Sequence, residues 1–242
     1  MPPPRRITIT TTTKIITMTD AMATVRLLAW LSPAFPTGGY AWSHGIEWAV
    51  ETGEIKDGAT LQAWIEDVLA LGAGRSDAIL LRHAHRAGDD VDTLADLAEL
   101  AAATAPCRER QAETLGQGGA FVLAAAPWHC TALAALAARI GSERVPYPIA
   151  VGAAAGSSGI AENDAALALL QAFAANLISA AVRLVPLGQT AGLRVLAALE
   201  PTIIAVARET ADAGLDDIGG ACFRSDIAAM RHETQYTRLF RS

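Results

Sequence analysis

The stretch TLQAWIEDVLALGAG, residues 60–74, gives the clearest indication of how this chain folds. Its apolar side chains recur at intervals of three and four residues, while Glu66 and Asp67 fall on the opposite side. That spacing is typical of a helix with one buried face, because an α-helix completes a turn about every 3.6 residues. The apolar positions are Leu61, Trp64, Ile65, Val68, Leu69 and Leu71.

The same period extends to other parts of the chain. It returns in residues 91–101 and, with apolar residues on both faces, in residues 163–184. Prolines and glycines divide the remainder into segments that each have room for one helix of ordinary length. Hydrophobic residues make up 52% of the chain and aromatics only 5%, so alanine and leucine dominate and favour helix over strand. We therefore expect an all-α fold, a single-domain bundle of roughly ten helices.

The two ends of the chain differ from this bundle. Residues 1–22 are rich in threonine and carry no apolar segment with a small-residue cleavage site, so they do not form a secretory signal. We expect residues 1–22 to be disordered, residues 23–224 to form the helical domain, and residues 225–242 to form a C-terminal tail.

Two long stretches carry no charged residue, 114–138 and 165–182. They contain glutamine, histidine and asparagine, and alanine contributes little to membrane insertion, so buried helices fit them better than membrane spans. These features predict a soluble, cytoplasmic protein without a membrane partner.

The charge of the chain is unevenly distributed. The formal net charge is −6, which argues against a general nucleic-acid partner, because phosphate contacts require a basic surface. Three arginines against one glutamate nevertheless give residues 230–242 a charge of +2 and leave −8 on the rest. The tail therefore has the opposite sign to the body.

Motifs for catalysis or cofactor binding are missing from the sequence. It has no G-x-x-x-x-G-K-[ST] motif, and the glycine clusters at 116–121 and 152–159 favour close helix packing over phosphate binding. The cysteines are far apart and predict unpaired thiols. His83 and His85 are two residues apart, so on a helix they point to different sides and do not chelate one ion. We expect no metal site, no bound cofactor and no catalytic residue in this chain. The three cysteines are Cys107, Cys130 and Cys222.

One enzymatic alternative stays open at this stage. His44 and Glu47 are three residues apart, so they either share a helix face or form a capping pair. A helical enzyme for a small acidic or phosphorylated substrate would place Arg183 in one pocket with this pair, because acid–base groups act within hydrogen-bonding reach.

Three blocks of sequence contain special residues without a local reason. The first is SPAFPTGGYAWSHGIEW, residues 32–48, where two prolines fix an extended segment, two glycines allow positive φ, and a serine starts a helix. It predicts a rigid turn whose aromatic side chains are either presented to a partner or packed in the core. The residues of this structural turn are Pro33, Pro36, Gly38, Gly39, Ser43 and Glu47.

The other two blocks centre on arginine. In AAVRLVPLGQT, residues 180–190, Arg183 closes a largely uncharged helix and must find a carboxylate, a carbonyl or a partner chain. The third block, MRHETQYTRLFRS, residues 230–242, combines tyrosine and arginine, which are the residue types expected at the anchors of protein interfaces.

These blocks, in this order and spacing, resemble those of the UreF family of urease accessory proteins. The resemblance covers residues 25–242, and its departures are small: Thr37, Trp42 and the GGACF run at 219–223. It implies an all-α homodimer that is not an enzyme. It also implies a complex with the GTPase UreG and the bridging protein UreD (also called UreH), which inserts nickel into apo-urease. Nickel and GTP would be handled by that complex rather than bound by this chain.

The resemblance also implies roles for individual residues. Arg183 and Gln189 would face the GTPase or a second copy of the chain, and whether the protein stimulates or restrains GTP hydrolysis stays open. The tail would bind the bridging partner, and we expect Tyr236, Leu239 and Phe240 to lack a full burial site until that partner arrives. The predicted partner-binding residues are Arg231, His232, Glu233, Tyr236, Arg238, Leu239, Phe240 and Arg241.

Overall fold

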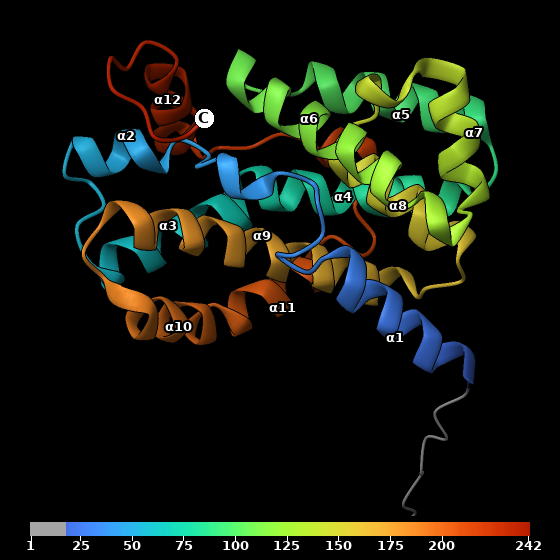
Figure 1. Cartoon of the computed structure of the whole chain (residues 1–242), viewed down its shortest axis with the longest axis horizontal. Helices are drawn as coiled ribbons and strands as arrows, with labels where there is room; N and C mark the ends of the chain where they lie inside the picture. The colour runs from blue at the N-terminus through green and yellow to red at the C-terminus, as the bar shows by residue number, and fades with distance from the viewer. Residues whose placement is uncertain (1–17) are drawn as a thin grey trace, which may run out of the picture.

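Helix α9, Glu162–Leu184, runs through the middle of the protein, and most of the other helices pack around it (Figure 1). The computed structural model describes residues 18–242, and within that range it is all-α, with no β-strand. The predicted fold class is therefore confirmed.

The described residues contain twelve α-helices and four short 3-10 helices, joined by turns and loops. The other α-helices are α1 (Met18–Trp30), α2 (Ile46–Glu51), α3 (Gly58–Leu71), α4 (Ala73–Ala87), α5 (Val91–Ala103), α6 (Arg108–Ala124), α7 (Thr131–Ile140), α8 (Tyr147–Ser157), α10 (Gly188–Ala198), α11 (Glu200–Glu209) and α12 (Phe223–His232). The 3-10 helices are η1 (Gly39–Ala41), η2 (Ala126–Trp128), η3 (Ser142–Arg144) and η4 (Leu215–Asp217).

The stretch 60–74 forms most of α3, as its spacing predicts. The Asp57 side chain caps the helix by accepting from the backbone N–H of Thr60. Five of the six predicted apolar positions are buried, and Leu71, at the last turn, is exposed. The helix ends there because Gly72 leaves the helical conformation, and α4 starts at the next residue.

The hydrophobic core has two neighbouring clusters. One lies among α4, α5, α6, α7 and α8 and includes Trp30 and Phe121, and the other lies among α2, α3, α9, α10 and α11. Helices α4 and α9 supply residues to both clusters, with Leu169 in the first and Leu170 in the second. The two clusters therefore share a common wall.

The glycine clusters mark close helix packing, as expected. A Cβ added at Gly118 of α6 would lie 1.9 Å from the carbonyl oxygen of Val145, and one at Gly152 of α8 would lie 2.3 Å from that of Leu81. Side chains at these positions are excluded because α6 and α4 lie against α8 at backbone distance.

The long uncharged stretches are only partly single helices. Residues 165–182 lie within α9, whereas residues 114–138 break between α6 and α7 at η2. By length and composition, residues 162–184 and 188–209 are able to span a membrane, although half of the first window is buried inside the protein.

The observed boundaries of the helical domain differ from the predicted ones. The expectation of disorder for residues 1–22 falls largely on residues 1–17, which lie outside the described residues, while Met18 already begins α1. At the other end, α12 runs across the expected boundary at residue 224 and packs against α2 and α6 (Figure 1). The tail is thus joined to the bundle.

Candidate functional site

The three special blocks of sequence meet at one place in the structure. The last residues of the chain run beside residues 41–43, where Arg241 N–H donates to the carbonyl of Ala41 at 2.8 Å and Ser43 N–H donates to the carbonyl of Ser242 at 2.9 Å. Figure 1 shows this C-terminal segment returning to the start of α2. We call residues 233–242, which follow α12, the tail strap.

The first block differs from its prediction in local conformation. Gly38 has a positive φ of 73°, but Gly39 does not, and α2 begins at Ile46 rather than at Ser43. A helix from Ser43 is blocked because His44 and Gly45 have φ values of 57° and 79°. The N-cap of α2 is Gly45, but the Ser43 hydroxyl still accepts from the Glu47 N–H in the first turn at 3.3 Å.

Most aromatic side chains of the first block serve the core. Phe35 packs against Phe121 and Trp128, and Trp42 is buried, while Tyr40 is exposed. Of the two readings left open for these rings, packing in the core holds for Phe35 and Trp42.

Gly45 lets α12 approach the first block. A Cβ at Gly45 would lie 2.7 Å from the backbone nitrogen of Ala229 in α12, and the positive φ at Gly45 also favours glycine. Any side chain here would push α12 away. The sequence HGIE therefore sets the position of the tail helix.

The carboxylate of Glu47 binds the tail strap. It accepts the backbone N–H of Leu239 at 2.6 Å and that of Phe240 at 2.9 Å, and it bonds to Nε2 of His232 at 3.0 Å. Glu47 is buried, so these three tail groups replace the water that the carboxylate gives up.

His232 is fully buried between two carboxylates. Its Nδ1 lies 2.7 Å from Glu109 of α6, and its Nε2 faces Glu47 of α2. The other oxygen of Glu109 accepts from Arg238 of the tail strap at 2.8 Å. One histidine therefore joins three elements.

Glu233 completes the attachment at the next position. Its carboxylate accepts the backbone N–H groups of Arg108 at 2.8 Å and Glu109 at 3.3 Å, at the N-terminus of α6. A carboxylate is stabilised there because the first turn of a helix has unpaired N–H groups and a positive dipole end. The tail thus supplies the cap that Cys107 does not.

Arg183, from the second block, also binds the first and third blocks. Its guanidinium donates to the carbonyl of Tyr40 at 2.7 Å and stacks 4.3 Å from the ring centre of Phe240. Of the three partners left open for this arginine, a carboxylate, a carbonyl or a partner chain, the structure shows a carbonyl. Gln189 is exposed at the start of α10 and makes no contact with this site.

The predicted tail residues divide into a buried and an exposed group. His232 and Phe240 are buried, so the expectation that Phe240 lacks a burial site until a partner arrives is wrong. Its ring lies against Arg183, and its backbone N–H donates to Glu47. Tyr236 is fully exposed and Leu239 is 67% exposed, and neither side chain packs against the core. Arg231, Arg238 and Arg241 are also exposed.

A second polar cluster lies beneath the strap. Arg110 and Glu113 of α6 form a buried ion pair, and the Ser242 hydroxyl donates to Glu113 at 3.1 Å. Burial acts to raise the pKa of Glu113, but the positive charge of Arg110 acts against it, and the pKa falls to about 2. Burial, and the same arginine, lower the pKa of His44 to about 4, so this imidazole is neutral at physiological pH.

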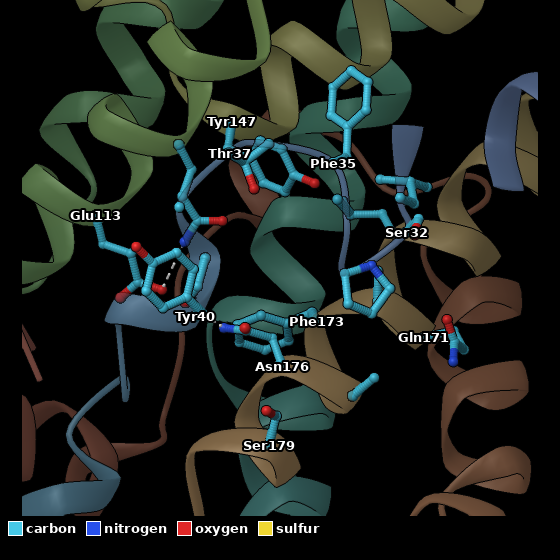
Figure 2. A pocket seen from close by; sticks show the side chains of 18 of the residues that line it. Ser32, Phe35, Thr37, Tyr40, Glu113, Tyr147, Gln171, Phe173, Asn176 and Ser179 are labelled. Atoms are coloured by element: carbon cyan, nitrogen blue, oxygen red, sulfur yellow. Dashed lines mark hydrogen bonds between the residues drawn. The ribbon is translucent and has the colours of Figure 1, made fainter. Parts of the chain in front are cut away.

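A cavity of about 350 Å³ opens beside this cluster (Figure 2). Residues 31–40 cover it, and Figure 2 shows Glu113, Tyr147, Phe173 and Asn176 around it. Asp77 lines both this cavity and a smaller one of about 100 Å³. Burial raises the pKa of Asp77 to about 7, with the Arg110 charge acting in the opposite direction.

The structure does not support the enzymatic alternative. Neither Arg183 nor Glu47 lines either cavity, and His44 lines only the smaller one. The Glu47 carboxylate is occupied by tail donors and the Arg183 guanidinium by Tyr40 and Phe240. Glu47 and Arg183 hold the tail in place, and the three side chains do not form one pocket for a substrate.

Residues 18–242 contain no group of three or more histidine, cysteine, aspartate or glutamate side chains placed to hold an ion. His83 and His85 instead bond to the carbonyls of Ala213 at 3.1 Å and Ile160 at 2.7 Å.

Sequence reasoning missed the contribution of α6 to the site. Glu109, Arg110 and Glu113 lie in the segment RERQAE, which reads as an ordinary charged helix start. One signal was available: Arg110 and Glu113 are three residues apart and precede an uncharged run, so this helix face carries charge next to a buried stretch.

Comparison with known proteins gives the same family as the resemblance of the three blocks. The family model described as UreF matches residues 55–200. The chain is 51% identical over 230 residues to the urease accessory protein UreF of Bradyrhizobium sp. strain BTAi1, covering 94% of this chain and 95% of that protein. It is 53% identical over 220 residues to the protein of the same name from Cereibacter sphaeroides strain KD131, covering 91% and 99%.

The similarity extends beyond the segment that the family model matches. A third protein of that name, from Methylorubrum populi, is 51% identical over 229 residues, which cover 93% of this chain and all of the relative. A match of this extent runs beyond residues 55–200 on both sides, and the shared name describes an auxiliary of urease rather than an enzyme. The chain belongs to the UreF family of urease accessory proteins.

Proposed function

We propose that this chain is a non-enzymatic scaffold for urease maturation that uses its tail to bind the bridging accessory protein UreD (UreH). Through that partner it would join UreG and apo-urease in the cytoplasm, where the complex inserts nickel. The family membership supports the role in urease maturation. We propose the named partners and the insertion of nickel in addition to that family role.

The observation that carries the proposal is the exposure of anchor-type residues on a fixed strap. Tyr236 and Leu239 point away from the core, although the backbone of the strap is bonded to Glu47, Ala41 and Ser43. An exposed aromatic side chain on a rigid support loses little conformational entropy on binding, which favours its use as an interface anchor.

The outer face of α12 extends this surface. Phe223, Ile227 and Met230 are exposed at intervals of four and three residues, so they form an apolar stripe on one side of the helix. Tyr236 and Leu239 add two more exposed apolar side chains to the tail, which also carries exposed arginines, and these residue types are common at protein interfaces.

Regulation of GTP hydrolysis is a separate part of the proposal. The contacts of Arg183 with Tyr40 and Phe240 favour a role in holding the tail over a role as an arginine finger. Gln189 is free to face the GTPase or a second copy in a homodimer. Single-turnover GTPase rates of the assembled complex, with and without this chain, distinguish stimulation from restraint.

The tail assignment is tested with point substitutions, because deleting residues 231–242 would remove the buried His232 and disturb the fold. The double variant Tyr236→Ala/Leu239→Ala alters only exposed side chains. Its affinity for the bridging accessory protein should fall at least tenfold, since each anchor contributes about 1–2 kcal/mol or more. The affinity is measured by titration calorimetry.

The matched control is Leu123→Ala, which removes a side chain of similar exposure from α6 outside the tail. It should bind like the wild type, and far-UV circular dichroism should show equal helix content in all three proteins. Wild-type affinity of the double variant would remove the tail from the proposed interface.

A further inference from the structure

The contacts of His232 set how many ring protons they need. Each ring nitrogen lies within hydrogen-bonding distance of a carboxylate oxygen, Nδ1 with Glu109 and Nε2 with Glu47. An ionised carboxylate only accepts hydrogen bonds, so both ring nitrogens must carry a proton for both bonds to form. The two contacts are therefore complete only when both ring nitrogens carry a proton.

The helix dipole favours a positive charge on His232, whereas its complete burial opposes one. It lies in the last turn of α12, where the helix dipole stabilises a cation. The charged groups around the bridge are Glu47 from α2, Glu109 from α6 and Arg238 from the tail strap. Glu233 bonds to the backbone of α6, and Glu113 is paired with Arg110. Asp226, on α12, is partly buried and its pKa is raised by burial.

Loss of one proton would break the bridge on one side. A neutral imidazole donates from one nitrogen only, so the lone pair of the other would face a carboxylate oxygen at 2.7 Å or 3.0 Å. That carboxylate would be left partly buried beside an acceptor, which is unfavourable. The affected carboxylates also hold the N–H groups of Leu239 and Phe240 and the Arg238 side chain.

We propose that Glu47, His232 and Glu109 form a proton-dependent clasp that positions the tail strap for its partner. With His232 doubly protonated, the strap is held and Tyr236 and Leu239 are presented together. With His232 neutral, the strap loosens and the anchors lose their common support. The positioning role rests on the proposed function of the tail, whereas the clasp itself is a property of this chain alone.

The clasp is tested without any partner by hydrogen exchange in the full-length protein. Protection factors of the Leu239 and Phe240 amides, which correct for the intrinsic pH dependence of exchange, are measured by NMR between pH 5.5 and 8.5. Wild-type protection should fall at least tenfold as the pH rises. His232→Gln should show low protection that does not change with pH.

The matched control is His83→Gln, because His83 bonds to a single carbonyl on another surface and should leave the wild-type profile intact. A second variant, Glu109→Gln, removes one of the two carboxylates and should move the loss of protection to lower pH. Flat wild-type protection, or an unchanged profile in Glu109→Gln, would overturn the clasp even if His232→Gln failed to fold.

The partner experiment separates the clasp from the proposed function. The ratio of affinities of wild type and His232→Gln for the bridging accessory protein should be large at pH 6 and approach one at pH 8.5. If exchange depends on pH but Tyr236→Ala/Leu239→Ala binds normally, the clasp stands and the docking role fails. If that double variant loses binding but exchange is independent of pH, the docking role stands and the clasp fails.

Discussion

At the scale of single residues, Gly45 decides how closely the tail helix approaches the first block. Gly45→Ala adds a Cβ 2.7 Å from the backbone nitrogen of Ala229 and requires an alanine at a φ of 79°. We expect the free energy of unfolding to fall by about 3 kcal/mol, combining the cost of left-handed backbone with that of overpacking. Urea denaturation measures the change.

Gly38→Ala provides the control for backbone strain alone. Gly38 has a similar φ of 73°, but no atom lies within 4 Å of an added Cβ. It should lose only about 1 kcal/mol, the cost of the left-handed conformation. Equal losses in the two variants would show that the contact between Gly45 and α12 does not matter to stability.

Asp77 makes stability depend on pH. Its pKa is raised from 3.8 to about 7, chiefly by burial. Between these values the folded state retains a proton that the unfolded chain releases, so this residue lowers stability as the pH rises from about 4 to 7. Asp77→Asn should remove that dependence and be more stable than wild type at pH 8, by about 1–3 kcal/mol.

The test compares urea unfolding of Asp77→Asn and wild type at several pH values, since His44, with a pKa lowered to about 4, contributes a slope of opposite sign in both proteins. Asp96→Asn, on the exposed face of α5, is the control and should keep the wild-type slope. A wild-type slope in Asp77→Asn would show that Asp77 is ionised throughout.

At the scale of helices, Gly118 sets the contact between α6 and α8. Gly118→Ala would place a Cβ 1.9 Å from the carbonyl oxygen of Val145, so the start of α8 must move. We expect the unfolding free energy to fall by about 3 kcal/mol or more. Gly116→Ala, two residues earlier on an exposed position of α6, should be neutral or gain up to about 1 kcal/mol from helix propensity.

Thermal and urea unfolding of these two variants measure how much the close contact between α6 and α8 contributes to stability. Because they share a helix and a chemical change, any difference in stability reports on the packing against α8. Comparable stability of the two variants would contradict the close approach of α6 and α8.

The helices were predictable from the sequence to the extent that their signals are local. The period of Leu61, Trp64 and Val68 predicts α3, and the glycines near 118 and 152 indicate close packing. The start of α2 was missed, since it depends on His44 adopting a positive φ that a bond to Ser242 supports. That contact links residues far apart in sequence, and no local pattern contains it.

The same limit applies to the candidate site. The sequence identified both Glu47 and His232, but as a helix cap and a tail residue, and their direct contact comes only from the fold. Glu109 was not predicted because a glutamate in a helical first turn has an ordinary explanation. The burial of Phe240 was likewise missed, since its contacts, the Arg183 guanidinium on its ring and the Glu47 carboxylate on its backbone N–H, come from other elements.

At the scale of the whole molecule, the shared wall between the two core clusters predicts one cooperative unit. Helix α9 places Leu169 in the first cluster and Leu170 in the second, and α4 places Leu81 and Ala78 likewise. Neither cluster therefore keeps its core if the other unfolds. The slowest-exchanging amides of α3 and α6 should report the same opening free energy.

A packing defect in one cluster provides the decisive test of this coupling. Gly118→Ala disturbs α6 and α8, which belong to the first cluster, while Ile65 of α3 lies in the second. In a single cooperative unit the defect lowers the opening free energy of both sets of amides by the same amount, because both exchange only through global unfolding. A loss confined to α6 and α8, with α3 unchanged, would mean that α4 and α9 separate two independent units.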